Sequence, residues 1–168
     1  NKELDLKWKN KLTNSKFNVG IAWSGSFNGP NEPYRSVPLK SFQEILKLDA
    51  NFYCLQNEIW DRDLEYFQKF KLNDCGKFKL DEIASIIMNL DLVITADTSI
   101  LHLSSILNKE TWAMLSLYPD WRWGKFNDFN PYSNLKFFNQ SKFNNWSNVE
   151  DSIFLALKDK INNFKKPE

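Results

Sequence analysis

The residues best suited to chemistry stand together in LDLVITADTSILHLSSIL, residues 90–107. The first half is an unbroken apolar run typical of a buried strand, and the second half has the apolar spacing of a helix. Asp97, Thr98 and Ser99 occupy the junction, and His102 follows within one turn. The N–H groups at a helix start lack intrahelical partners and carry the positive end of the helix dipole. The junction is therefore a natural seat for a phosphate, but simple capping of the helix by Asp97 or Thr98 is the interpretation that the residues alone favour.

His102 is the one histidine of the sequence, and its role is open between chemistry and structure. On a helix beginning near Ser99, the stripe expected to face a sheet consists of Ile100, Leu103, Ile106 and Leu107. His102 falls at the edge of that stripe. A single histidine and two distant cysteines provide no ligand spacing, so no metal site is predicted. The sequence VGIAWSGS does not fit the glycine-rich dinucleotide fingerprint either.

The elements that must position the junction alternate along the chain between strands and helices. Strands are predicted over residues 17–23, 51–56, 91–96, 111–117 and 135–139, the last as an edge strand. Helices are predicted over residues 39–48, 58–70, 80–90, 99–107 and 148–166, and residues 24–38 form a loop rich in Gly, Pro and Asn. The uninterrupted apolar middle strands favour an α/β fold, a parallel sheet covered by helices on both faces. We expect one domain over residues 1–168, with residues 1–16 as a polar lead-in segment.

Composition and charge limit the partners. The chain of 168 residues has 22 basic and 21 acidic side chains, a formal net charge of +1, and therefore no long-range field for nucleic acid or an anionic membrane. Two cysteines are too few for a disulfide framework. No stretch has the length and apolar character of a transmembrane helix or signal sequence. We expect a soluble cytoplasmic domain with a small or neutral partner.

Several blocks occur in an order that resembles a known family. VGIAWSGS, YRSVPL, FYCLQ, LDLVITADTSILHLSSIL, PDWRWGKFND and NPYSNLKFFNQ are similar to the C-terminal glycosyltransferase-like domain of bacterial tetratricopeptide-repeat proteins, a group related to the heptosyltransferase family. The resemblance runs from Asn18 to the final helix. It implies a Rossmann-like sheet that forms the C-terminal half of a GT-B glycosyltransferase, the half that binds the nucleotide sugar.

Carried over by position, the resemblance implies roles for two groups of residues. The donor diphosphate would be held by Asp97, Thr98, Ser99 and His102. The turn after the first strand, which lies across the cleft near donor and acceptor, corresponds to Ser24, Gly25 and Ser26. From the residues alone, Gly25 can equally serve a plain positive-φ turn.

The resemblance also places charged residues at the donor. Arg35 in YRSVPL matches the family's arginine, and it would join His102 in stabilising the leaving group. A structural ion pair is the other reading of Arg35. Asp120 and Arg122 in PDWRW follow the last buried strand and are expected on the same rim, while the neighbouring tryptophans, Trp121 and Trp123, suit either a sugar face or packing onto the sheet.

The implied function is donor binding in a metal-independent transfer of a hexosyl or heptosyl group. No cofactor is expected, since a nucleotide diphosphate sugar is the donor substrate. The acceptor would be a glycan or a protein, and a missing N-terminal half or repeat region would supply the general base, so the chain alone should turn over poorly. Ser105, Asn108 and Glu110 replace two glycines and a proline of the family pattern. These departures favour the alternative function, a noncatalytic Rossmann-like binding or interaction module.

Overall fold

The structure of the protein is a computed structural model. The structure describes residues 1–12, 15–26, 32–70, 72–74, 77–123 and 130–164. Residues 27–31 of the predicted loop and the last two residues of the predicted final helix lie outside these ranges.

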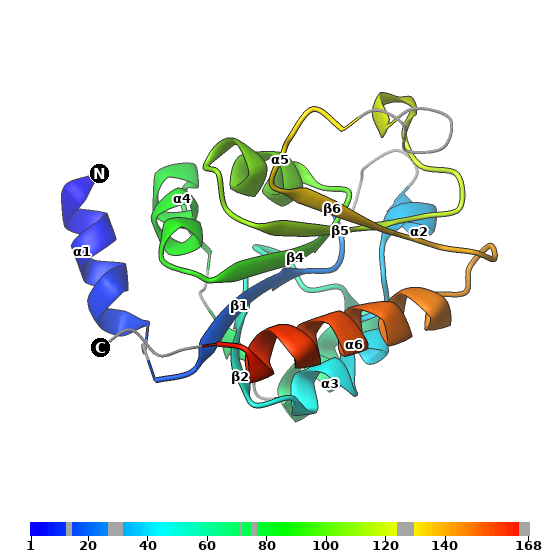
Figure 1. Cartoon of the computed structure of the whole chain (residues 1–168), viewed down its shortest axis with the longest axis horizontal. Helices are drawn as coiled ribbons and strands as arrows, with labels where there is room; N and C mark the ends of the chain where they lie inside the picture. The colour runs from blue at the N-terminus through cyan, green and yellow to red at the C-terminus, as the bar shows by residue number, and fades with distance from the viewer. Residues whose placement is uncertain (13–14, 27–31, 71, 75–76, 124–129, 165–168) are drawn as a thin grey trace.

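Six parallel strands form one sheet (Figure 1). They are β1 (Phe17–Ala22), β2 (Ala50–Cys54), β3 (Asn73–Asp74), β4 (Leu92–Ala96), β5 (Thr111–Leu115) and β6 (Leu135–Asn139), in the order β3-β2-β1-β4-β5-β6. Ile21 of β1 pairs with Cys54 of β2 on one side and with Ile94 of β4 on the other. After β3 the chain crosses back over the sheet to place β4 beside β1, so the strand order reverses between β1 and β4. The parallel α/β sheet is confirmed, and β6 is an edge strand as predicted.

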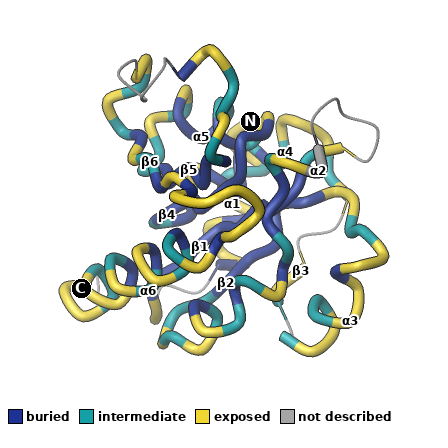
Figure 2. Tube along the Cα trace, turned by 90° about the vertical axis from the view of Figure 1, so that its right-hand side faces the viewer, coloured by how far each residue is buried: buried dark blue, intermediate teal, exposed yellow. Residues whose placement is uncertain are grey.

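Helices cover both faces of the sheet (Figures 1 and 2). They are α1 (Lys2–Lys11), α2 (Glu32–Arg35), α3 (Asp61–Phe70), α4 (Leu80–Met88), α5 (Ser99–Ile106) and α6 (Ser147–Asn162). One core cluster joins alternate residues of β1 to the buried stripe of α6, Val149, Ile153 and Leu157. The opposite cluster joins the sheet to α1 and α4. Within the described ranges, no helix has the length and apolar character needed to cross a membrane.

The first residues, expected only as a polar lead-in, include a helix. Asn1 caps α1. Glu3 and Asp5 lie in its first turn, where their negative charges interact favourably with the positive end of the helix dipole. Trp8 is buried, contacts Phe78 edge-on at 5.4 Å and donates through Nε1 to Glu82 Oε1 at 3.3 Å. One large apolar side chain thus docks an otherwise polar helix against α4.

The helix predicted over residues 39–48 consists instead of two 3₁₀ turns, η1 (Leu39–Phe42) and η2 (Ile45–Lys47). Leu39, Phe42 and Ile45 are buried at intervals of three residues. That spacing suits a 3₁₀ helix, in which residues three apart lie on one side. Burial of these three side chains against the core therefore takes precedence over the α-helical pattern.

The predicted sheet-facing stripe of α5 is wrong in part. Leu101 is fully buried together with Ser104 and Ser105, whereas Ile106 is exposed. The helix packs on two sides, because Leu101 faces the β5 region while Ile100, Leu103 and Leu107 pack toward the α4 cluster. Ser104 Oγ donates to the Ile100 carbonyl at 2.8 Å and accepts from Thr111 Oγ1 at 2.9 Å, so a polar residue is satisfied on the buried side.

Candidate functional site

The two predicted turns meet at the carboxyl ends of the central strands. Ala22 of β1 pairs with Thr95 of β4, so the residues that follow each strand emerge side by side. They form a pocket of about 260 Å³ whose lining includes Ser24, Gly25, Ser26, Thr98 and Ser99. We call it the turn pocket. It lies where the strand order reverses, the place where open α/β sheets bind ligands.

The first turn of α5 forms one wall of the turn pocket. Thr98 is the N-cap, and its Oγ1 accepts from the backbone N–H of Ile100 at 3.3 Å. Thr98 Oγ1 also lies 3.2 Å from Thr95 Oγ1, which fixes the capping rotamer. Capping by Thr98 is therefore confirmed, and it sets the start of the helix at Ser99, an exposed residue of the pocket wall. The positive end of the helix dipole faces the same space.

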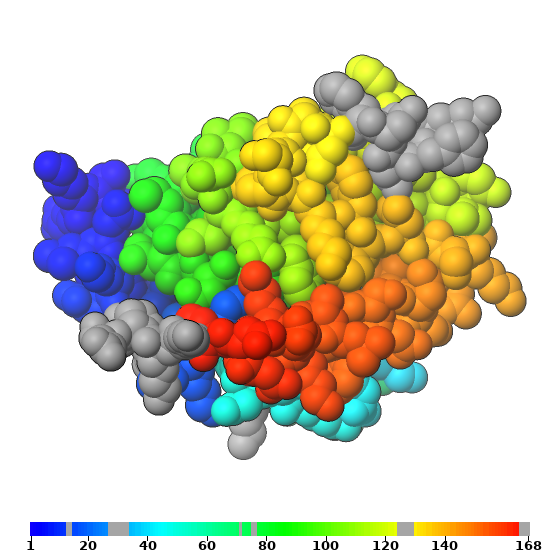
Figure 3. Space-filling view, in the orientation of Figure 1, coloured from blue at the N-terminus to red at the C-terminus, as the bar shows by residue number. Residues whose placement is uncertain are grey.

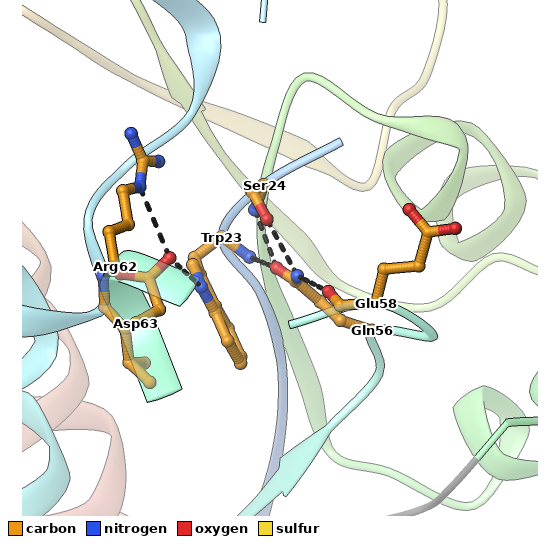
Figure 4. Close-up of polar contacts among 7 residues, drawn as sticks. Trp23, Ser24, Gln56, Glu58, Arg62 and Asp63 are labelled. Atoms are coloured by element: carbon orange, nitrogen blue, oxygen red, sulfur yellow. Dashed lines mark hydrogen bonds and ion pairs between the residues drawn. The ribbon is translucent and has the colours of Figure 1, made fainter. Parts of the chain in front are cut away.

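Gln56 holds the opposite wall (Figure 4). Its Oε1 accepts from the backbone N–H groups of Trp23 at 2.6 Å and Ser24 at 2.7 Å. Its Nε2 donates to Ser24 Oγ at 2.8 Å and to the Glu58 carbonyl at 2.9 Å. One buried amide thus satisfies four polar groups and joins the end of the β1 strand to the chain after β2. Gln56 was not among the predicted site residues, although its place at the carboxyl end of a predicted strand could have indicated it.

Asp63 holds the turn that follows β1 through two hydrogen bonds. Asp63 is 1% exposed, its Oδ2 accepts from Trp23 Nε1 at 3.0 Å, and its Oδ1 accepts from the Leu39 N–H at 2.9 Å. Arg62 Nε lies 3.5 Å from the same carboxylate (Figure 4). In the sequence Asp63 resembles any acidic residue in the first turn of a helix, so no local signal marks it.

Four other predicted residues lie across the turn in a second, larger space. Arg35, Asp97, Asp120 and Arg122 line a cleft of about 590 Å³, which we call the rim cleft. Arg122 Nε forms an ion pair with Asp120 Oδ1 at 3.1 Å. The turn between β4 and α5 thus separates two cavities, with Asp97 in the rim cleft and Thr98 and Ser99 in the turn pocket.

His102 lies behind this turn. Among the described residues, His102 lines neither the turn pocket nor the rim cleft. Its ring stacks on Trp123 at 5.5 Å and 11°, and its Nδ1 lies 3.2 Å from the Tyr132 hydroxyl. Trp123 Nε1 donates to Asp97 Oδ2 at 3.0 Å, so His102 contacts the site through Trp123 and Asp97.

Burial sets the charge of the imidazole. Burial lowers the pKa of His102, and Arg122 acts in the same direction, while Asp97 and Asp120 oppose them. The neutral imidazole is therefore favoured. Packing onto the sheet is confirmed for Trp123, which is fully buried, whereas Trp121 is exposed.

A cavity larger than the rim cleft and the turn pocket lies at the other end of the strands. It has about 660 Å³ and lies beside the first residues of β1, β5 and β6, with Trp112, Lys136 and Lys160 in its lining. Lys160 is paired with Glu110 at 2.7 Å. None of the residues predicted for chemistry lies in the lining of this cavity, so size alone does not identify the functional site.

The fold and the site together define a Rossmann-like α/β domain with a pocket where its strand order reverses. Residues 47–153 match the model of glycosyltransferase family 9 (heptosyltransferase), and the chain belongs to that family. No curated protein matches the sequence significantly.

Solved structures share the fold at low sequence identity. The glycosyl transferase family 9 protein from Veillonella parvula is 14% identical with a TM-score of 0.66, over 96% of this chain and 52% of that one. The ADP-heptose lipopolysaccharide heptosyltransferase II of E. coli is 12% identical with a TM-score of 0.63, over 94% and 51%. E. coli heptosyltransferase WaaC with ADP-2-deoxy-2-fluoro heptose is 12% identical with a TM-score of 0.56, over 94% and 47%. The chain therefore spans about half the length of these transferases.

Proposed function

We propose that this chain is the nucleotide-sugar binding half of a metal-independent GT-B glycosyltransferase. The observation that carries the proposal is the turn pocket, where the α5 N-terminus meets Ser24, Gly25 and Ser26 at the reversal of strand order. Membership of the family supports a nucleotide sugar as the donor. Because E. coli heptosyltransferase WaaC has been solved with ADP and with ADP-2-deoxy-2-fluoro heptose, adenosine diphosphate is the first nucleotide to test.

The proposed chemistry is stabilisation of the departing diphosphate. Negative charge grows on the leaving oxygen as the bond to the sugar breaks, and donors fixed in advance lower the energy of that state. The hydroxyl and the backbone N–H of Ser99 would supply such donors, with the helix dipole behind them, since the N–H groups of Ile100 and Leu101 already donate to Thr98. Arg35 would add its charge from the neighbouring cleft. We assign His102 to a positioning role, because its contacts run to Trp123 and Tyr132.

The rest of the enzyme would face this edge of the sheet. We propose that a second Rossmann-like half, from an N-terminal segment or a repeat-containing region like that of the tetratricopeptide-repeat proteins, supplies the acceptor site and the general base. The coverage of about half of each solved transferase supports this. This chain by itself would then bind the donor with little turnover, and the acceptor would be a glycan or a protein.

The noncatalytic alternative depends on the altered residues after His102, and the structure accommodates them. Asn108 adopts a φ of 55°, a conformation that Asn tolerates better than most residues, in place of the family's glycine. Glu110 Oε1 accepts from Trp112 Nε1 at 3.0 Å. Ser105 is buried, and its Oγ has no hydrogen-bond partner among the described residues. These changes lie at the far end of α5, away from the turn pocket.

A thermal-shift titration with ADP, UDP, GDP and CDP tests the proposal. A ligand at one hundred times its Kd stabilises the fold by about 2.7 kcal/mol, a rise in Tm of roughly 5–10 °C. Ser99→Asp should abolish this rise without unfolding the protein, because a carboxylate at a helix start opposes a phosphate but favours the helix.

The matched control is Ser147→Asp at the first residue of α6, which should leave the nucleotide response intact. If no nucleotide raises the Tm at millimolar concentration, or if Ser99→Asp responds like the wild type, the assignment of the turn pocket is refuted.

A further inference from the structure

Helix α1 is held to the rest of the molecule by few contacts. In the space-filling view its residues, coloured blue, lie at one end of the molecule against the green residues of α4 (Figure 3). A polar helix of ten residues is marginally stable on its own, so the order of α1 depends on the docking of Trp8, its buried residue. Asp5 opposes this docking, because its Oδ1 is buried with no hydrogen-bond partner among the described residues. Small changes can therefore shift α1 between docked and released positions.

Trp8 is connected to the turn pocket through Phe78. The two rings meet edge-on, with 5.4 Å between their centroids. The backbone of Phe78 is bonded in both directions to the side chain of Asn57. Its N–H donates to Asn57 Oδ1 at 3.3 Å, and Asn57 Nδ2 donates to its carbonyl at 3.4 Å. Asn57 directly follows Gln56, and both residues line the turn pocket. Two contacts thus separate Trp8 from the wall of the pocket.

A second set of contacts joins α1 to the same pocket through α4. Glu82 Oε1 accepts from Trp8 Nε1 at 3.3 Å and forms an ion pair with Lys7 Nζ at 2.7 Å. The next residue, Ile83, is buried and lines the turn pocket. Because Glu82 and Ile83 are consecutive on one helix, α1 and the turn pocket contact the same turn of α4.

We propose that α1 is a positioning element of the turn pocket, with Trp8 as its anchor. Docking of Trp8 holds Asn57 and Ile83 in the places where a ligand in the pocket meets them, so an occupied pocket and a docked α1 stabilise each other. The coupling is reciprocal, since binding must strengthen docking by the same factor by which docking strengthens binding. Release of α1 from α4 would then weaken ligand binding, which makes α1 a regulatory element. The identity of the ligand, a nucleoside diphosphate, rests on the proposed function, whereas the coupling can also be measured without a ligand.

Amide hydrogen exchange followed by NMR measures the coupling in the free protein. The Ser24 N–H donates to Gln56 Oε1 in the pocket wall, and the Gln140 N–H donates to the Leu115 carbonyl elsewhere at the carboxyl edge of the sheet. Trp8→Ala should speed exchange at Ser24 by about threefold or more relative to Gln140. A general loss of stability would instead speed both amides alike.

Calorimetry with ADP, UDP, GDP and CDP measures the coupling to the ligand. Trp8→Ala should raise the Kd of the bound nucleotide about three- to tenfold, the loss expected for one aromatic contact. Trp8→Phe keeps a ring against Phe78 and should bind within about twofold of the wild type. Val149→Ala, in the core cluster on the other face of the sheet, is the matched control, because it should lower the Tm and leave the Kd unchanged. Saturating nucleotide should slow trypsin cleavage after Lys9 by the factor that Trp8→Ala costs in affinity.

The outcomes separate this inference from the proposed function. The inference is overturned if Trp8→Ala changes exchange at Ser24 and Gln140 alike, or if Trp8→Ala binds a nucleotide as tightly as the wild type. Faster exchange at Ser24 alone, without nucleotide binding by any variant, would support the coupling of α1 to the pocket and refute the pocket as a donor site. The two proposals therefore fail separately.

Discussion

Asp63→Asn isolates the contribution of one buried carboxylate to the turn pocket. The two carboxylate oxygens accept from Leu39 N–H and Trp23 Nε1–H. An amide has the same shape, but one of its ends is an NH₂ group that must face one of these donors. One charge-assisted bond is lost, and a buried donor is left without an acceptor, at a cost of about 2–4 kcal/mol. Because Trp23 begins the turn, nucleotide affinity should fall as well.

Urea unfolding followed by circular dichroism measures this loss in the free energy of unfolding. The m value, which is the slope of that free energy against urea concentration, should not change. The Tm should fall by about 5–15 °C. The matched control is Asp61→Asn, which removes the same charge from the exposed first residue of α3 and should cost no more than about 0.5 kcal/mol. If Asp63→Asn is no more destabilising than Asp61→Asn, the carboxylate does not hold the turn.

Three further predictions concern the core, the imidazole and the first helix. Gly20→Ala should destabilise the fold by about 1–3 kcal/mol in urea unfolding, because the added Cβ would lie 2.5 Å from Leu90 Cδ1. Burial lowers the pKa of His102 in the folded chain, so the unfolded chain binds this proton at higher pH than the folded chain does. The free energy of unfolding of the wild type should therefore decrease as the pH falls below about 6.5, and His102→Gln should weaken this pH dependence in thermal melts. Trp8→Ala should release α1 and speed trypsin cleavage after Lys9, whereas Leu6→Ala should not, since Leu6 is exposed.

The strands other than β3 were predictable because each contains a short run rich in apolar residues, whereas β3 consists of the exposed polar residues Asn73 and Asp74 and was not predicted. Burial on both faces of the sheet requires such runs, and β4 and β5 are buried at every position. Their parallel order follows from the alternation with helices, which places the residues after β1 and β4 at one edge. Ser24 to Ser26 and Thr98 to Ser99 could therefore be predicted to meet from the sequence.

The supports of the site were not predictable, because they depend on contacts distant in sequence. Gln56 and Asp63 reach the Trp23 turn from 33 and 40 positions away. No residue type or local pattern distinguishes Asp63 from an exposed acidic residue, and only its place at the end of a predicted strand marks Gln56. The predicted buried stripe of α5 was wrong in part for a related reason. A helix that packs against both a sheet and α4 buries two of its sides, and apolar periodicity identifies only one buried side.

The contacts of Asp97 connect the two cavities. Its Oδ2 holds Trp123, on which His102 stacks, and its side chain lines the rim cleft. The next residue, Thr98, caps the helix that forms the wall of the turn pocket. A change in the position of the Asp97 side chain is therefore expected to affect both the packing of Trp123 and the start of α5.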